Sequence, residues 1–202
     1  MNWLAHLYLS DANAQFRVGN LLPDLTSASR LVGLPEPYQR GIRRHRQIDV
    51  FTDAHPRVKS SVSRFPKPYR RYGAILTDVY FDYFLARDWL KYSEVPLSEF
   101  IGDVYRDIEV CLPEAPPEAA DILRRMRDEN WLAAYHHIPG ITETLRRISR
   151  RFRRPFDLSG SLPIFQEHGD AFADDFHCFF PELMMRVQRT SSPKSPLLSS
   201  NK

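Results

Sequence analysis

The sequence predicts an all-α protein, a single-domain helical bundle, and three observations carry that prediction. Only 8 of its 202 residues are glycine and long β-branched runs are few, which argues against an all-β design. The 16 prolines lie mostly between stretches of helical periodicity, where they separate helices. The chain is 43% hydrophobic and 12% aromatic and shows no repeat or linker, so we expect one packed core over residues 1–188.

The N-terminal elements are predicted to be short helices that lead into a long one. Residues 2–9 read as an apolar helix, and Ser10 and Asp11 are expected to cap a second helix that runs toward Gly19. The segment 19–24 reads as a break, which would put Asp24 at a helix end or in a turn. A long helix is expected to begin at the prolines 35 and 37 and to end at Pro56.

The remaining helices are likewise bounded by prolines and loop residues. They are predicted at residues 56–65, 68–90, 96–112, 117–135, 138–151 and 161–188. The five phenylalanines of the last helix are expected to be core residues: Phe165, Phe172, Phe176, Phe179 and Phe180. Residues 189–202 lack apolar periodicity and are predicted to form a disordered tail.

Composition limits the compartment and the partners. No apolar stretch is long enough to span a membrane, and Met1-Asn2-Trp3 has no basic signal region. Cys111 and Cys178 form no metal motif and no disulfide framework, so a reducing, cytoplasmic compartment is expected. The net charge is +3, and a dense arginine block at residues 146–154 is either a solvated basic face or a surface for an anionic partner.

The most informative pattern is an imidazole followed by two carboxylates at four-residue spacing. His45, Asp49 and Asp53 lie on one stripe of the predicted long helix, since a helix turns roughly 100° per residue. The helix at 68–90 repeats the spacing with Asp78 and Asp82, on the same side as several apolar residues. Acids on an apolar face need compensation for their desolvation. One imidazole with convergent carboxylates suits a divalent cation such as Mn, Fe, Mg or Zn.

Each residue also has a simpler structural explanation. His45 and Asp49 alone would form an ordinary surface pair on a helix, and Asp24 alone would be a helix cap. His6 lies in an apolar segment and is either a core histidine or a site residue. The other histidines at 136, 137 and 168 have no partner at ligand spacing and are interpreted as structural or surface residues.

Several motifs in the same order resemble those of the bacterial acyl carrier protein phosphodiesterase family. They cover about residues 1–188, and they are Met1-Asn2-Trp3-Leu4-Ala5-His6-Leu7, Gly19-Asn20-Leu21-Leu22-Pro23-Asp24, His45-Arg46-Gln47-Ile48-Asp49 with Thr52-Asp53, Asp78-Val79-Tyr80-Phe81-Asp82-Tyr83-Phe84-Leu85, and Trp131-Leu132-Ala133-Ala134-Tyr135. The resemblance implies a divergent, HD-domain-like fold of the HD phosphohydrolase superfamily. It also implies a hydrolase, with manganese as the favoured cation, that removes 4′-phosphopantetheine from holo acyl carrier protein.

The resemblance implies roles for particular residues, with one departure from the usual signature. The chain has no adjacent His-Asp pair, and Asp24 stands where a first histidine ligand is usual. The implied metal ligands are Asp24, His45, Asp49 and Asp78. The catalytic candidates are Asp53, Asp82 and His6. Asp53 and Asp82 are each a candidate acceptor for a ligand imidazole, a general base for water or a ligand of a second metal.

The expected partner is holo acyl carrier protein, which the resemblance describes as a small acidic helical bundle. Arg43, Arg44 and Arg46 flank the candidate site and are predicted to bind this substrate. Two other functions remain open at this point: an HD-type phosphohydrolase of a small nucleotide, and a non-catalytic basic module. The arginine block has little aromatic interleaving and no recognised nucleic-acid motif, so no nucleic-acid partner is expected. The oligomeric state is left open.

Overall fold

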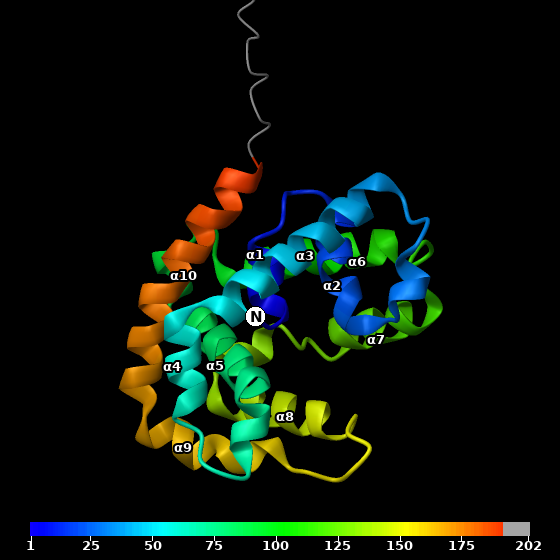
Figure 1. Cartoon of the computed structure of the whole chain (residues 1–202). Coiled ribbons are helices and arrows are strands. Elements are labelled where there is room, and N and C mark those ends of the chain that lie inside the picture. Colours follow the sequence, from blue (N-terminus) through cyan, green and yellow to red (C-terminus); the bar gives the residue numbers. More distant parts are fainter. Residues whose placement is uncertain (192–202) are drawn as a thin grey trace, which may run out of the picture.

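The structure is a computed structural model that describes residues 1–191, and over these residues the fold is all-α, as predicted (Figure 1). The α-helices are α1 (Trp3–Tyr8), α2 (Ala14–Leu25), α3 (Glu36–Ala54), α4 (Pro56–Ser63), α5 (Gly73–Arg87), α6 (Leu97–Cys111), α7 (Pro117–Asp128), α8 (Ile138–Ser149), α9 (Leu162–Glu167) and α10 (Gly169–Ser191). Short 3-10 helices are η1 (Ala28–Leu31), η2 (Tyr69–Tyr72), η3 (Trp89–Lys91), η4 (Ala133–His136) and η5 (Leu158–Ser161). The predicted tail lies outside the described residues from 192 onward, and α10 itself runs to Ser191.

The structure contradicts two predictions about the second helix: the residue at which it begins and the break at residues 19–24. Asn13, rather than Ser10 or Asp11, caps α2, because its side-chain oxygen accepts the Phe16 backbone N–H at 2.9 Å. The helix then continues through the expected break at 19–24 to Leu25, with Pro23 inside it. Asp24 therefore lies in the last turn of α2, which agrees with its predicted place at a helix end.

Two glycines explain why α2 continues through the expected break. At Gly19 an added Cβ would lie 2.4 Å from the Tyr38 carbonyl oxygen, and at Gly41 it would lie 2.2 Å from the Phe16 carbonyl oxygen. The backbones of α2 and α3 thus touch where they cross. This packing outweighs the local preference for a break at Gly19 and Pro23, and it holds Asn20 of α2 against α3.

Several later boundaries also differ from the prediction. The helix expected at 117–135 ends at Asp128, because Asn130 adopts a left-handed φ of 50° and the Trp131 N–H returns to the Met126 carbonyl at 2.9 Å. The last helix is two helices that meet at His168. Instead of the single helix predicted at 68–90, the structure has the 3-10 helix η2, the α-helix α5 and the 3-10 helix η3.

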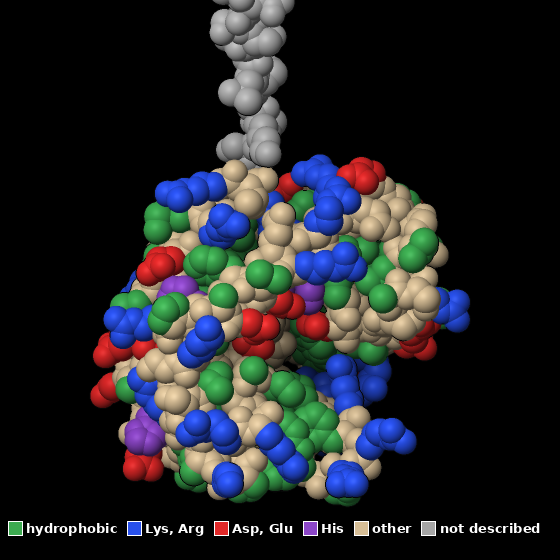
Figure 2. All heavy atoms as spheres, viewed as in Figure 1, with side chains coloured by type: hydrophobic (Ala, Val, Ile, Leu, Met, Phe, Trp, Pro, Cys, Tyr) green, Lys and Arg blue, Asp and Glu red, His purple; other side chains and the backbone are tan. Residues whose placement is uncertain are grey.

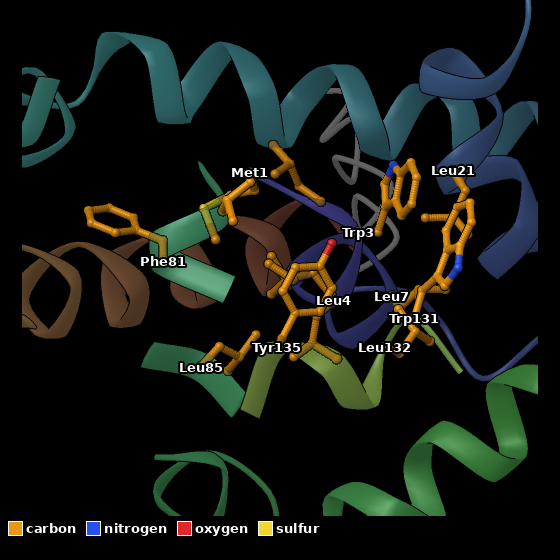
Figure 3. Close-up of a cluster of buried hydrophobic side chains, with 14 of the residues drawn as sticks. Met1, Trp3, Leu4, Leu7, Leu21, Phe81, Leu85, Trp131, Leu132 and Tyr135 are labelled. Atoms are coloured by element: carbon orange, nitrogen blue, oxygen red, sulfur yellow. The ribbon is translucent and has the colours of Figure 1, made fainter. Parts of the chain in front are cut away.

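The core forms where α1 and α5 meet the aromatic face of α10. All five phenylalanines predicted as core residues are buried, at Phe165, Phe172, Phe176, Phe179 and Phe180. Around α1, Trp3 and Leu4 pack with Trp131 and Tyr135 (Figure 3). Helix α1 is therefore enclosed at the centre of the molecule. Among residues 1–191 no helix combines the length and the apolar character needed to cross a membrane.

Candidate metal centre

Three side chains from two helices meet at one point beside α1. His45 and Asp49 are neighbours on α3, and the His45 Nε2 lies 3.0 Å from the Asp49 Oδ2. His6 comes from α1 and stacks on His45 with 4.2 Å between ring centroids, and its Nε2 lies 3.2 Å from the Asp49 Oδ1. One ligand atom from each of the three lies within 4.8 Å of the others, as in a site that could hold a divalent metal.

Asn20 determines which nitrogen of each imidazole faces this point. The backbone carbonyl of Asn20 can only accept a hydrogen bond, so the His45 Nδ1, at 2.8 Å, must donate to it. The Asn20 side-chain amide donates to the His6 carbonyl at 2.7 Å and to Ser10 at 2.9 Å, which leaves its oxygen to accept from the His6 Nδ1 at 3.0 Å. Both rings therefore direct Nε2 at the carboxylate of Asp49.

This arrangement fits a bound cation. With Nδ1 protonated, a neutral imidazole offers only a lone pair at Nε2, and in both histidines that lone pair faces an Asp49 oxygen. The His6 Nε2 also lies 3.1 Å from the Met1 carbonyl oxygen, another acceptor. Facing lone pairs repel unless a proton or a cation lies between them. A second polar shell that orients two imidazoles is also what metal-binding histidines require.

Burial and neighbouring charges shift the pKa values of the three side chains in this cluster. Burial opposes protonation of His45, but Asp49 and Asp24 outweigh it and raise the pKa of this imidazole. Burial lowers the pKa of His6, which is fully enclosed. Burial would raise the pKa of Asp49, but the hydrogen bonds that His45 and His6 donate when their Nε2 atoms carry a proton hold it well below its usual range. Asp49 is therefore an anion near neutral pH.

Asp24 lies at the edge of this cluster. Its Oδ1 is 3.6 Å from the His45 Nε2, and its Oδ2 accepts the Trp3 indole N–H at 3.2 Å. The side chain is 40% exposed, so the Trp3 contact is what orients it. Asp24 therefore approaches the Nε2 of His45 from the end of α2.

Asp78 of α5 reaches the cluster from the other side. The Met1 amino group lies 3.2 Å from the Asp78 Oδ1 and 3.6 Å from the Asp49 Oδ1. Burial raises the pKa of Asp78 to about 6 against the opposing charge of the Met1 amino group. Burial would lower the pKa of that amino group, but Asp78 and Asp49 raise it to about 10. The space between these two carboxylates, where the Met1 amino group lies, therefore favours a positive charge.

The two remaining acids of the predicted stripes have very different surroundings. Asp82 is fully buried and accepts the backbone N–H groups of Leu4 at 2.8 Å and Ala5 at 3.2 Å. Burial raises its pKa to about 8, although these two bonds favour the charged form. Its carboxylate therefore fastens the start of α1 to α5. Asp53 is exposed, one turn beyond Asp49 on α3.

The three arginines predicted to bind substrate are not equivalent. Arg44 is 6% exposed and donates to the Leu9 carbonyl at 2.9 Å. Arg43 is exposed and pairs with Glu36 at 2.5 Å. Arg46 is exposed and lines a cavity of about 440 Å³ next to η1. Only Arg43 and Arg46 of these three present their charge to solvent.

Acidic side chains gather near the centre of the face in Figure 2, beside a histidine and at the rim of a hollow. Lysine or arginine side chains lie across that hollow. A larger cavity, of about 690 Å³, is lined by other residues, among them Trp89, Leu97 and Ile101. None of the residues that line it belongs to the group His6, His45 and Asp49.

Sequence reasoning missed Asn20 and underrated His6. Asn20 was interpreted as part of a break, so its position facing two histidines was not expected. The available signal was its place beside Gly19: a small residue marks close helix packing as readily as a turn. His6 was weighed as a core residue or a site residue, and the structure makes it both buried and part of the cluster.

Comparisons with known proteins give one consistent result. The model of a family described as acyl carrier protein phosphodiesterase matches residues 1–183. An acyl carrier protein phosphodiesterase of Enterobacter sp. (strain 638) is 33% identical over 189 residues, which is 93% of this chain and 98% of that protein. The protein of the same name from Pectobacterium atrosepticum is 33% identical over 185 residues, 91% of this chain and 96% of that protein. No solved structure matches the chain.

Proposed function

The chain belongs to the acyl carrier protein phosphodiesterase family, and we propose that it hydrolyses the phosphodiester between a carrier-protein serine and 4′-phosphopantetheine with the help of a divalent cation. The observation that carries the cation is the pair of Nε2 atoms of His6 and His45, both turned toward Asp49. The reaction adds water across the P–O bond to serine. The products are the serine hydroxyl of the apo carrier protein and free 4′-phosphopantetheine.

We propose His6, His45 and Asp49 as the centre of the ligand set. Asp24, 3.6 Å from the His45 Nε2, and Asp78, which contacts the Met1 amino group beside Asp49, are the candidates to complete it. A divalent cation bound there would polarise the phosphoryl group and lower the pKa of an attacking water. The nitrogen and carboxylate donors suit manganese. This set adds His6 to the ligands that the family resemblance implied.

The protein's own groups have separable tasks in this proposal. Asn20 orients both imidazoles, and Trp3 orients Asp24. Asp82 positions α1, which carries His6, because both of its oxygens are occupied by backbone N–H groups. Asp53 is exposed next to the cluster and is the better placed of the two acids to accept a proton from water.

The test is mass spectrometry of holo acyl carrier protein after incubation with the chain and Mn²⁺. We expect loss of the whole phosphopantetheine group, no reaction in excess chelator, and recovery when Mn²⁺ is restored. His45→Ala and Asp49→Ala should abolish the reaction, whereas Asp121→Ala, on the exposed surface of α7, should not. Full turnover by metal-free protein, or by the His45 variant, would refute the proposed centre.

A further inference from the structure

Trp3 connects the acidic cluster to a second group of side chains. The Trp3 and Trp131 rings stack with 5.7 Å between centroids and 11° between planes (Figure 3). The Arg151 guanidinium lies over Trp3 at 5.7 Å, and the Arg147 guanidinium lies over Trp131 at 3.8 Å. Two arginines at the end of α8 therefore flank a tryptophan pair whose first member holds Asp24.

Neither of these two arginines forms a close ion pair with a carboxylate among the described residues. Within residues 1–191 neither Arg147 nor Arg151 has a carboxylate oxygen within 4 Å, whereas their neighbour Arg150 pairs with Glu143 at 3.1 Å. Burial lowers the pKa of both guanidiniums, although Tyr135, Glu129 and Glu143 act in the opposite direction on Arg147, and Asp24 does so on Arg151. Arg147 is partly buried, and a partly buried cation without an ion-pair partner is costly, so an anion that binds it offsets that cost.

A small cavity between these residues gathers hydrogen-bond donors that have no partner. It measures about 20 Å³ and is lined by Asn2, Trp3, Tyr135, Thr144, Arg147, Ile148 and Arg151. Among the described residues, the Asn2 Nδ2, the Thr144 Oγ1 and one Arg147 terminal nitrogen are buried without a hydrogen-bond partner. Thr144 is only 3% exposed. The cavity admits about one oxygen atom, since a water needs ~10–15 Å³ of this kind of volume.

We propose that Arg147 and Arg151 bind the phosphodiester anion of the substrate, with one non-bridging oxygen in the donor-lined cavity. This inference rests on the proposed function. Trp3 connects the anion site to the metal centre, because it lines the cavity while its indole N–H donates to Asp24. Amide, hydroxyl and guanidinium donors together favour an anionic oxygen over a neutral one.

The first test uses the full chain in excess chelator, so that it does not depend on metal or on turnover. Inorganic phosphate and dimethyl phosphate are titrated at constant ionic strength while tryptophan fluorescence is recorded, because Trp3 and Trp131 border the subsite. We expect saturable binding that is weakened about 10- to 100-fold in Arg151→Met and Arg147→Met, as for loss of a charge-assisted hydrogen bond. Arg150→Met should bind like the wild type.

Arg147 packs on Trp131, so its variant is also checked by thermal unfolding, while the exposed Arg151 gives the independent variant. Absence of saturable binding in the wild type, or equal affinity in all four proteins, would overturn the subsite. The second test measures kcat/KM for holo acyl carrier protein, which should fall about 10- to 100-fold in Arg151→Met. If the wild type proves inactive on that substrate, the proposed function fails, and the anion titration still decides the subsite.

Discussion

Asn20 orients both histidines, one with its side chain and the other with its main chain. The carbonyl serves His45 and the side-chain amide serves His6. We predict that Asn20→Ala lowers the affinity for Mn²⁺ by about 10- to 100-fold, the usual effect of removing a partner of a ligand histidine. Isothermal titration of the metal-free protein measures it.

The matched control for this variant is Gln15→Ala. Gln15 lies on the same helix and bonds to Glu114 on the surface, away from the histidines. Its Mn²⁺ affinity should equal that of the wild type. Unchanged affinity in Asn20→Ala would mean that His6 is oriented without the Asn20 side chain, and the place of His6 in the ligand set would have to change, because the variant keeps the carbonyl that orients His45.

The candidate site could be predicted only as far as spacing along a helix allows. His45 and Asp49 are one turn apart, so their pairing follows from helix geometry alone. The approach of His6 and Asn20 depends on how α1 and α2 pack, and no local pattern encodes that. Asp82 shows the same limit: four-residue spacing places it near Asp78, but its bonds to Leu4 and Ala5 come from a segment 78 and 77 residues away.

At the scale of elements, the crossing of α2 and α3 holds Asn20 next to His45. We predict that Gly41→Ala destabilises the protein by about 1–3 kcal/mol, the usual cost of overpacking, because its Cβ would meet the Phe16 carbonyl oxygen at 2.2 Å. Chemical denaturation measures the change. Gly102→Ala on α6 is the control: its Cβ would meet only the Arg106 side chain at 3.7 Å, so this variant should be stabilised by about 0.5–1 kcal/mol.

A Gly41→Ala variant as stable as the wild type would show that the crossing is not close-packed. A loss of stability in Gly102→Ala as well would mean that the effect of an added Cβ is not specific to the crossing. The metal affinity of Gly41→Ala should also fall, because Asn20 follows the backbone of α2. In Gly102→Ala it should stay unchanged.

The contact of Asp88 with α10 makes the free energy of unfolding depend on pH. Asp88 follows α5 and bonds to Arg87 at 2.7 Å and to His177 of α10 at 2.8 Å. The Arg87 hydrogen bond, with help from His177, lowers the pKa of Asp88 to about 2 from 3.8. A depressed carboxyl pKa adds stability above the unfolded-state pKa, and that stability is lost as pH falls from 3.8 toward 2.

We therefore predict that Asp88→Asn is less stable than the wild type by about 1–2 kcal/mol near neutral pH, after allowance for solvent screening of Arg87. The difference should shrink as pH falls and vanish near pH 2. Thermal unfolding across this range measures it. A difference that is constant with pH would mean that packing, and not charge, is responsible.

The helices were largely predictable because prolines and periodicity are local signals. α3 begins and ends as predicted to within a residue or two, since prolines bound it on both sides. Helix ends that are not marked by a proline were not predicted. Asn130 ends α7 through a left-handed backbone, which a helix-compatible stretch of residues does not reveal. The turn at His168 and Gly169 is likewise followed at once by more helix-forming sequence.

At the scale of the whole molecule, charge is separated in a way that suits an acidic protein substrate. The net charge is +3, acidic side chains gather near the centre of the face in Figure 2, and α3 and α8 carry exposed arginines. An acidic carrier protein would be attracted by the rim, while its phosphodiester is drawn to the centre by a bound cation. Rim charges act mainly on the rate of association and are screened by salt.

We predict that Arg43→Glu/Arg46→Glu raises KM for holo acyl carrier protein several-fold at low salt and leaves kcat nearly unchanged. The buried Arg44 is left intact, because its bond to the Leu9 carbonyl makes it part of the fold. Arg106→Glu/Arg124→Glu, with the same change in net charge on α6 and α7, is the control and should change KM less. Near 1 M salt, where the Debye length is about 3 Å, the three proteins should converge. If the wild-type KM does not depend on salt, and the charge-reversed variant has the same KM, electrostatic docking by α3 is excluded. The metal centre would then have to recognise its substrate through the phosphodiester alone.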